Sequence, residues 1–295
     1  MEYLHLFNTK YEHDTLRNGN KYKEPWLAYV RNDSLVTGNK PHDYSKDYLT
    51  FKALENANFS FFIEGTGATV ISYSIDNGKT WVDIASNIST PTVAAGNKIL
   101  FKATLNATTN GVGGFSSTGR YEAMGNPYSM LYGDDFNGKL DISDKFSGIA
   151  ALFYSDEKLI SAKNLSLPAT TLGDSCYLDM FNGCISLTVG PKILPATNLT
   201  THCYYNMFRN CTSLTAAPEL PATTLAYGCY TCMFYGCTSL NYIKAMFTTD
   251  PGTSTTNWVI RVAGTGTFVK NSAATWETEG ISGVPSGWTI EYADE

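Results

Sequence analysis

One stretch occurs three times in this chain, as LPATTLGDSCYLDMFNGCISL from Leu167, LPATNLTTHCYYNMFRNCTSL from Leu194 and LPATTLAYGCYTCMFYGCTSL from Leu220. A degenerate earlier copy places Phe153 and Leu159 at the phases of Phe181 and Leu187, so the array begins near residue 149. Apolar residues at fixed phases of such a period indicate units that bury their apolar faces only by stacking on one another. The sequence therefore predicts a solenoid.

The cysteines follow the same period. Six of the seven occupy two repeat phases, with Cys176, Cys203 and Cys229 in one column and Cys184, Cys211 and Cys237 in the other. Cys232 is the extra residue. With Cys229 it forms a C-x-x-C motif, but no second C-x-x-C or histidine lies nearby, as a zinc site would require. Because buried cysteine behaves as a small apolar residue, we expect two columns of free thiols, no disulfide framework and no metal.

The combined pattern MF-x-x-C-x-S-L and LPAT-x-L resembles the BspA-type leucine-rich repeats of gut Bacteroidota and their crAss-like phages. The resemblance covers residues 149–245 of the 295, and the parts that flank the repeats are also similar to flanking parts of such proteins. It implies a surface-exposed, non-enzymatic recognition or structural protein. It does not identify a ligand.

Outside the repeats, short runs of aromatic and β-branched residues separated by turn formers predict strands. Residues 47–108 read as a small β-sandwich that is immunoglobulin-like in architecture, 109–148 as a Gly-rich connector, and 246–295 as a C-terminal cap. The predicted fold class is mainly β, with an immunoglobulin-like β-sandwich followed by a short leucine-rich-repeat solenoid of BspA type and a C-terminal β cap.

Residues 1–46 are interpreted as an N-terminal docking arm. Tyr22, Trp26, Leu27 and Tyr29 make this segment too apolar for a solvated linker, so we expect these side chains to be buried. Two partners remain open for them, the next domain of this chain or another subunit.

The stretch SIDNGKTW, residues 74–81, resembles the Asp-box of sialidases and related glycoside-cleaving propellers. The other interpretation is a tight β-hairpin in which Ser74 and Asp76 bind turn amides, Gly78 takes a positive φ and Trp81 covers the corner. A propeller would carry several boxes at blade spacing, whereas this chain has one. We therefore interpret the motif as a structural hairpin and not as an active site.

Composition and charge exclude several function classes. With 16% charged residues and a net charge of -6, the chain lacks the excess of positive charge that would attract nucleic acid or anionic lipid. No apolar run spans a bilayer, and the first residues lack a Sec-type signal, so we expect a cytoplasmically made product without a membrane partner. The histidines are scattered, at His5, His13, His42 and His202. No catalytic constellation emerges, and we expect neither an enzyme nor a cofactor.

These observations favour a phage virion surface protein, such as a head-fibre, decoration or tail-associated component. It would dock on capsid or tail proteins by its arm, form a homo-oligomer, and present the repeats to a host or mucosal surface. The alternative is an adhesin on the bacterial cell surface.

Ligand contacts are expected where aromatic residues depart from the repeat. Tyr177, Tyr204 and Tyr230 recur at one phase and are predicted to form part of the solenoid wall. The non-repeating tyrosines are free to contact a glycan or a partner protein, and they are Tyr205, Tyr227, Tyr235 and Tyr242. The alternative is that these rings only cover neighbouring repeats.

Overall fold

The chain divides into two compact units, Met1–Asp43 and Tyr44–Glu295. The computed structural model describes residues 28–31, 34–37, 42–63, 70–105 and 113–293. In the first unit, β1 (Ala28–Arg31) and β2 (Ser34–Thr37) form an antiparallel pair. Tyr22, Trp26 and Leu27 lie outside the described residues, and Tyr29 is described only as backbone of β1. The docking arm therefore stays a prediction.

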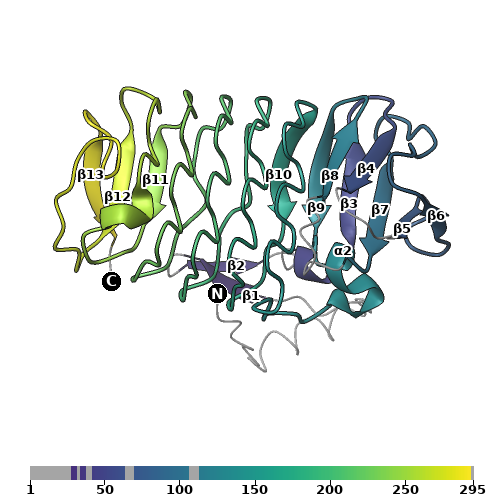
Figure 1. The fold of residues 1–295 in the computed structure, drawn as a ribbon, viewed down its shortest axis with the longest axis horizontal. Coiled ribbons are helices and arrows are strands. Elements are labelled where there is room, and N and C mark those ends of the chain that lie inside the picture. The colour runs from purple at the N-terminus through teal and green to yellow at the C-terminus, as the bar shows by residue number, and fades with distance from the viewer. Residues whose placement is uncertain (1–27, 32–33, 38–41, 64–69, 106–112, 294–295) are drawn as a thin grey trace, which may run out of the picture. The chain divides into compact units, whose positions relative to one another are not determined.

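The second unit begins with two sheets (Figure 1). The larger has the order β10-β9-β3-β7-β5-β6, and the smaller pairs β4 with β8. The strands are β3 (Leu49–Ala53), β4 (Phe59–Ile63), β5 (Ile71–Ser74), β6 (Val82–Ile84), β7 (Lys98–Ala103), β8 (Gly113–Ser117), β9 (Tyr121–Gly125) and β10 (Leu159–Leu165). The helices are short, namely η1 (Tyr44–Lys46), α2 (Ser129–Tyr132), η2 (Gly133–Phe136) and η3 (Gly252–Thr255). The predicted mainly β class is confirmed.

Aromatic side chains fill the space between these two sheets. Phe51 on β3 contacts Phe115 on β8 edge-to-face, with ring centroids 4.7 Å apart, and lies 5.3 Å from Phe59 on β4. Phe101 on β7 joins the same cluster, and all four rings are buried. Such pairs add about 0.5–1.5 kcal/mol each beyond the area they bury. The alternation of apolar residues along each strand therefore produces a shared core.

The range 109–148, predicted as a connector, contributes strands to both sheets. β8 pairs with β4, opposing Phe115 to Phe61, while β9 pairs antiparallel with β3 and parallel with β10. The boundary predicted at residue 108 thus falls inside the sheets. Glycine here permits close packing, since a Cβ on Gly113 would lie 2.6 Å from the ring of Phe61. The prediction of a connector was therefore wrong for β8 and β9, where glycine serves as a small strand residue and does not mark a linker.

The repeats form successive coils that hydrogen-bond to one another in a regular way. In the segment 175–183, the amides of Ser175 and Tyr177 donate to carbonyls of the next coil, and every second amide up to Gly183 does the same. The intervening amides, beginning with Leu178, close turns to the carbonyl three residues earlier. Equivalent segments at 147–155, 202–210 and 228–236 continue the pattern. Nearly every backbone donor in these segments therefore has a partner.

This turn pattern requires a left-handed residue at every fourth position. In the second full repeat these positions are His202, Asn206 and Asn210, with φ of 54°, 55° and 59°. Glycine and asparagine adopt such angles most readily, and glycine takes the equivalent position at Gly183 and Gly236. The Asn, Ser and Gly content of the repeats thus follows from the backbone.

One core runs from the sheets into the coils. Phe153, Phe181, Phe208 and Phe234 stack in sequence, with centroid distances of 5.3, 5.1 and 5.8 Å. At the sheet end of this column, Phe153 also lies 5.8 Å from Phe51. The amide of Phe115 donates to the carbonyl of Leu152, so backbone bonds join the two parts as well. Sheets and coils consequently belong to one compact unit.

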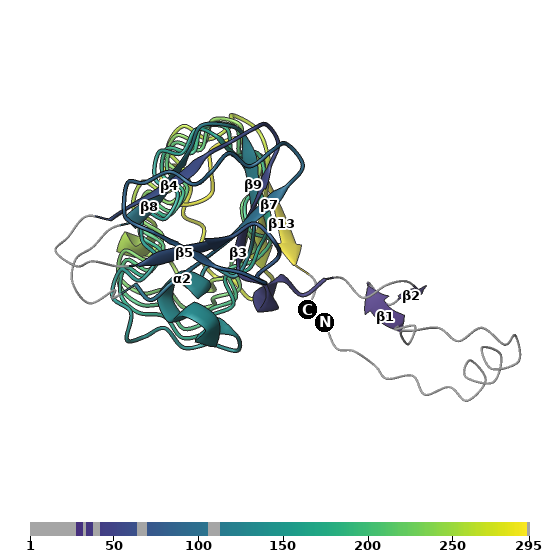
Figure 2. The same cartoon turned by 90° about the vertical axis from the view of Figure 1, so that its right-hand side faces the viewer.

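The range 246–295, predicted as a cap, continues the stacking. β11 (Tyr242–Ala245), β12 (Thr267–Asn271) and β13 (Thr289–Ala293) form a parallel sheet. On the opposite side, the amide of Tyr230 donates to Ser254 and that of Val259 to Ile281. In Figure 2 these coils overlap behind the two sheets. The last part of the chain adds coils rather than a separate element.

Candidate functional site

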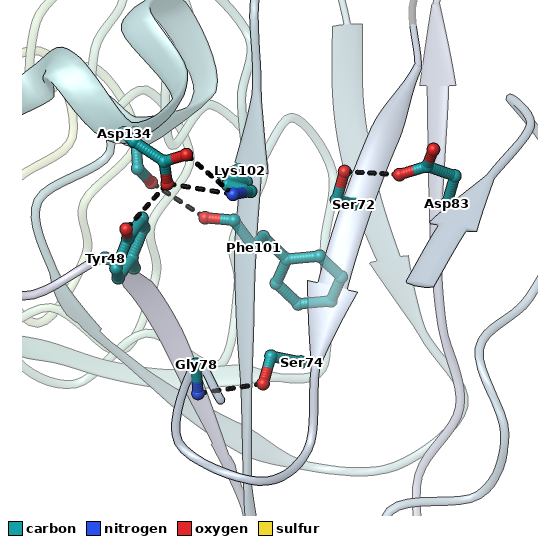
Figure 3. Close-up of polar contacts among 9 residues, drawn as sticks. Tyr48, Ser72, Ser74, Gly78, Asp83, Phe101, Lys102 and Asp134 are labelled. Carbon is teal, nitrogen blue, oxygen red and sulfur yellow. Dashed lines mark hydrogen bonds and ion pairs between the residues drawn. The ribbon is translucent and has the colours of Figure 1, made fainter. Parts of the chain in front are cut away.

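The Asp-box residues bind their own loop. Figure 3 shows the amide of Gly78 donating to Ser74 Oγ, at 2.8 Å. Asp76 accepts from the amide of Thr80 at 3.0 Å and from its hydroxyl at 2.7 Å. The Thr80 amide bond is the largest of the effects that lower the pKa of Asp76 to about 2. The predicted roles of Ser74 and Asp76 are confirmed, as is the positive φ of Gly78, at 81°.

The loop is longer than the tight hairpin that the sequence suggested. β5 and β6 pair with Tyr73 opposite Val82, so Asn77 and Gly78 are not a two-residue turn between paired strands. The side chains of Ser74 and Asp76 fold the intervening residues, and both Asn77 and Gly78 have positive φ. The tight-hairpin prediction was wrong in length and right in its hydrogen bonds.

Trp81 packs against a cluster of polar side chains. Figure 3 shows the members of this cluster, Tyr48, Lys102 and Asp134, bonded to one another. Lys102 Nζ lies 4.3 Å from the Trp81 ring centroid and 2.8 Å from Asp134 Oδ1. The Tyr48 hydroxyl donates to the same oxygen at 2.7 Å, and its ring lies 4.9 Å from that of Trp81. Burial is the main cause that raises the pKa of Tyr48 to about 12, and the Lys102 hydrogen bond lowers that of Asp134. The contacts among Trp81, Tyr48, Lys102 and Asp134 therefore fix the end of the 74–81 loop against the sheet.

Acid should loosen this loop through Asp76. Its folded pKa of about 2 lies below the unfolded value, so the carboxylate stabilises the fold above the unfolded value and loses that effect as pH falls toward 2. We expect the melting temperature to fall more between pH 4 and pH 2 for the wild type than for Asp76→Asn. Equal decreases for the two proteins, measured by circular dichroism, would contradict this role.

A second candidate site lies on the turn segments of the coils. We call the turn face the outward side chains of the segments 175–183, 202–210, 228–236 and 253–261, together with Tyr227, which precedes the third segment. His202 makes edge-to-face contacts there with Tyr205, at 5.3 Å, and with Tyr227, at 5.4 Å. Tyr227 is 65% exposed. Two predicted contact residues are thus brought together by a histidine.

A cationic cluster lies on the same face. The guanidinium carbon of Arg209 lies 4.7 Å from the ring centroid of Tyr235, and that of Arg261 lies 6.0 Å from it. Within the described ranges neither arginine forms an ion pair with a carboxylate. Arg209 precedes Cys211 by two residues and Tyr235 precedes Cys237 by two, so repeat phase alone places them in adjacent coils. This spacing is visible in the sequence, but the criterion of tyrosines that depart from the repeat does not include arginines.

The remaining tyrosines divide between wall and surface. Tyr177, Tyr204 and Tyr230, which recur at one repeat phase, are buried and stack at 5.4 and 5.8 Å. Tyr242 lies on β11, opposite Thr267, and is 38% exposed. It therefore lies on the parallel sheet of β11, β12 and β13 and not on the turn face. The structure thus places three of the four predicted contact tyrosines on the turn face and the fourth elsewhere.

The thiols are all free, and six of them are buried. In the second column each sulfur reaches a carbonyl of the preceding coil, with Cys211 Sγ 3.0 Å from the carbonyl oxygen of Phe181. Cys184 and Cys237 repeat the contact with Phe153 and Phe208 at 2.9 Å. A serine hydroxyl at position 211 would therefore have the same carbonyl within reach. We expect Cys211→Ser to cost about 1 kcal/mol.

Alkylation should distinguish the buried columns from Cys232, which is half-buried. Burial raises the pKa of the column thiols, including Cys184 and Cys211, which suppresses the reactive thiolate. We expect maleimide to label Cys232 first in the native protein and all seven cysteines after unfolding without reductant, as read by mass spectrometry. Disulfide-linked peptides, or equal native labelling rates, would overturn this account.

The described ranges contain no group of three or more His, Cys, Asp or Glu residues arranged to hold a metal ion. Among the helices in those ranges, none has the length and apolar character needed to cross a membrane. Comparisons with protein-family models, curated proteins and solved structures give no match for this chain.

Proposed function

We propose that this chain is a non-enzymatic virion surface protein, a head-fibre, decoration or tail-associated component. In this proposal an immunoglobulin-like sandwich leads into a BspA-type leucine-rich-repeat solenoid, and the arm before Tyr44 docks on capsid or tail proteins. The regular backbone bonding from coil to coil supports the solenoid assignment. The facing sheets with their aromatic core support the sandwich.

The observation that carries a recognition role is the contrast between the two sides of each turn segment. The inward phases hold the buried Cys203 and Phe208, whereas the outward phases of the same segment hold Tyr205 and Arg209. Stacking fixes the backbone of these segments, so the outward side chains are displayed on a rigid support. A rigid face whose side chains are not needed for packing suits binding to a host glycan or protein.

The free thiols favour a virion component over the alternative, an exported adhesin on the bacterial cell surface. Proteins that fold in oxidising compartments commonly pair their cysteines, whereas this chain has an odd number, all free. Virion proteins that assemble inside the host cell fold in a reducing environment. The proposal therefore puts the mature protein on the outside of a particle that is built in the cytoplasm.

Deleting residues 1–43 tests the docking role. Because Tyr44–Glu295 is a separate compact unit, we expect the truncated chain to keep its melting temperature within a few degrees and to be lost from assembled particles. Incorporation is measured by mass spectrometry of purified particles, with the full-length chain as reference.

A matched control carries the double substitution Arg209→Ala and Arg261→Ala in the full-length chain, which alters the turn face and leaves the arm intact. We expect this variant to be incorporated like the wild type. Truncated protein at wild-type abundance in the particles would refute docking by the arm.

A further inference from the structure

The turn face carries two positive charges that lack a counter-charge among the described residues. Arg209 and Arg261 both lie against Tyr235, so their guanidinium carbons are no more than about 11 Å apart. Like charges at such a distance repel, and an anion bound beside them relieves the repulsion. The carboxylates of the described residues form no ion pair with either group. The cluster is therefore complementary to an anion.

Tyr235 holds the Arg209 guanidinium in position. At 4.7 Å over the ring, the group gains a cation–π contact that orients its plane while its edge keeps hydrogen-bond donors. Arginine in this state binds a carboxylate through two parallel hydrogen bonds and loses little side-chain entropy on binding. The contact favours a planar, bidentate anion over a spherical one.

The turn face also carries an amide and aromatic rings of the kind that contact a sugar ring. Asn206, between Tyr205 and Arg209 in the sequence, is 8% exposed, and its Oδ1 has no hydrogen-bond partner among the described residues. A buried amide oxygen without a partner carries an energetic cost, and a ligand hydroxyl that reaches Oδ1 would remove that cost. The rings of Tyr205 and Tyr227, which meet at His202, add flat apolar surface of the kind that packs against a pyranose.

We propose that the turn face binds an acidic saccharide, with the carboxylate on Arg209, the positive charge of Arg261 nearby, and the sugar ring toward Asn206 and Tyr205. The inference deepens the recognition role proposed above and rests on it. Nucleic acid fits less well, because the chain has a net charge of -6 and two cations are too few to neutralise a phosphate backbone. The amide and the aromatic rings beside the cations favour a sugar acid over a simple inorganic anion.

Titration of the full-length protein with sialyllactose and, separately, with lactose tests this site. The two sugars share the lactose unit and differ in the acidic residue. We expect sialyllactose to bind and lactose to bind at least about tenfold more weakly, since charged hydrogen bonds to the carboxylate are absent. Arg209→Ala should weaken sialyllactose binding by about tenfold, Arg261→Ala should weaken it less, and Arg209→Lys should weaken it less than Arg209→Ala.

Lys192→Ala is the matched control, because it removes one exposed positive charge outside the turn face. We expect its affinity to equal that of the wild type, with melting temperatures verifying that every variant is folded. No binding of sialyllactose at millimolar concentration, equal affinity for lactose, or full binding by the double arginine variant would overturn the inference. Particle incorporation is measured separately, so loss of the sugar site with normal incorporation rejects this inference and leaves the virion role standing.

Discussion

Phe208→Ala should lower the free energy of unfolding by about 3–5 kcal/mol. The ring is fully buried and lies between Phe181, at 5.1 Å, and Phe234, at 5.8 Å, in the middle of the column that joins the coils. Its removal leaves a cavity that the hydrogen-bonded backbone on either side cannot close. Urea denaturation followed by circular dichroism measures the change.

Phe146→Ala is the control for this substitution. Phe146 is 51% exposed, so the same truncation should change the free energy of unfolding by about 0.5 kcal/mol or less. Similar losses in the two variants would show that the phenylalanine column does not hold the coils together.

Gly125→Ala should destabilise the protein by about 3 kcal/mol or more, because two costs combine. Gly125 ends β9 with a φ of 82°, and a Cβ there would lie 2.0 Å from the carbonyl oxygen of Tyr48. The carbonyl of Gly125 also accepts the amide of Ser166, so the backbone cannot move without breaking the join between the sheets and the coils. Thermal and urea denaturation give the magnitude.

Gly96→Ala separates the two costs. Gly96 has a φ of 86°, and a Cβ added there would meet no atom within 4 Å, so only the backbone cost of about 1–2 kcal/mol applies. Equal destabilisation at the two sites would contradict the steric role assigned to Gly125.

The repeats were predictable because each phase has one structural role. A residue that recurs at 27- and 26-residue offsets must meet the same demand in every coil, so Cys203 and Tyr204 could be assigned to the interior from sequence. The same reasoning separated Tyr205 from the wall. Periodicity alone was therefore enough to predict the packing of the coils.

The parts that were missed depend on contacts between distant segments. Gly113 and Gly114 resemble linker residues in sequence, and only the approach of Phe61 and Ala151 explains why they are small. Likewise, Asn77-Gly78 suggests a two-residue turn, but Asp76 organises a longer loop through Thr80. Local sequence does not encode which partner a glycine or a carboxylate will meet.

The candidate site was predicted in part. Tyr205, Tyr227 and Tyr235 were selected because they depart from the repeat, and the structure places them on one face. Tyr242 met the same criterion but lies on β11, because departure from a repeat marks a free position without saying on which side of the coil it lies. Comparing phases in adjacent coils would have added Arg209 beside Tyr235.

Localisation of the chain is the decisive test of the virion role. Particles purified from cultures that produce this chain, and washed envelopes of the same cells, are compared by quantitative mass spectrometry and by immunogold labelling with antibodies against the turn face. We expect a constant copy number in the particles and labelling of intact particles on their outer surface. Recovery of the chain in the cell envelopes and its absence from the particles would contradict this role.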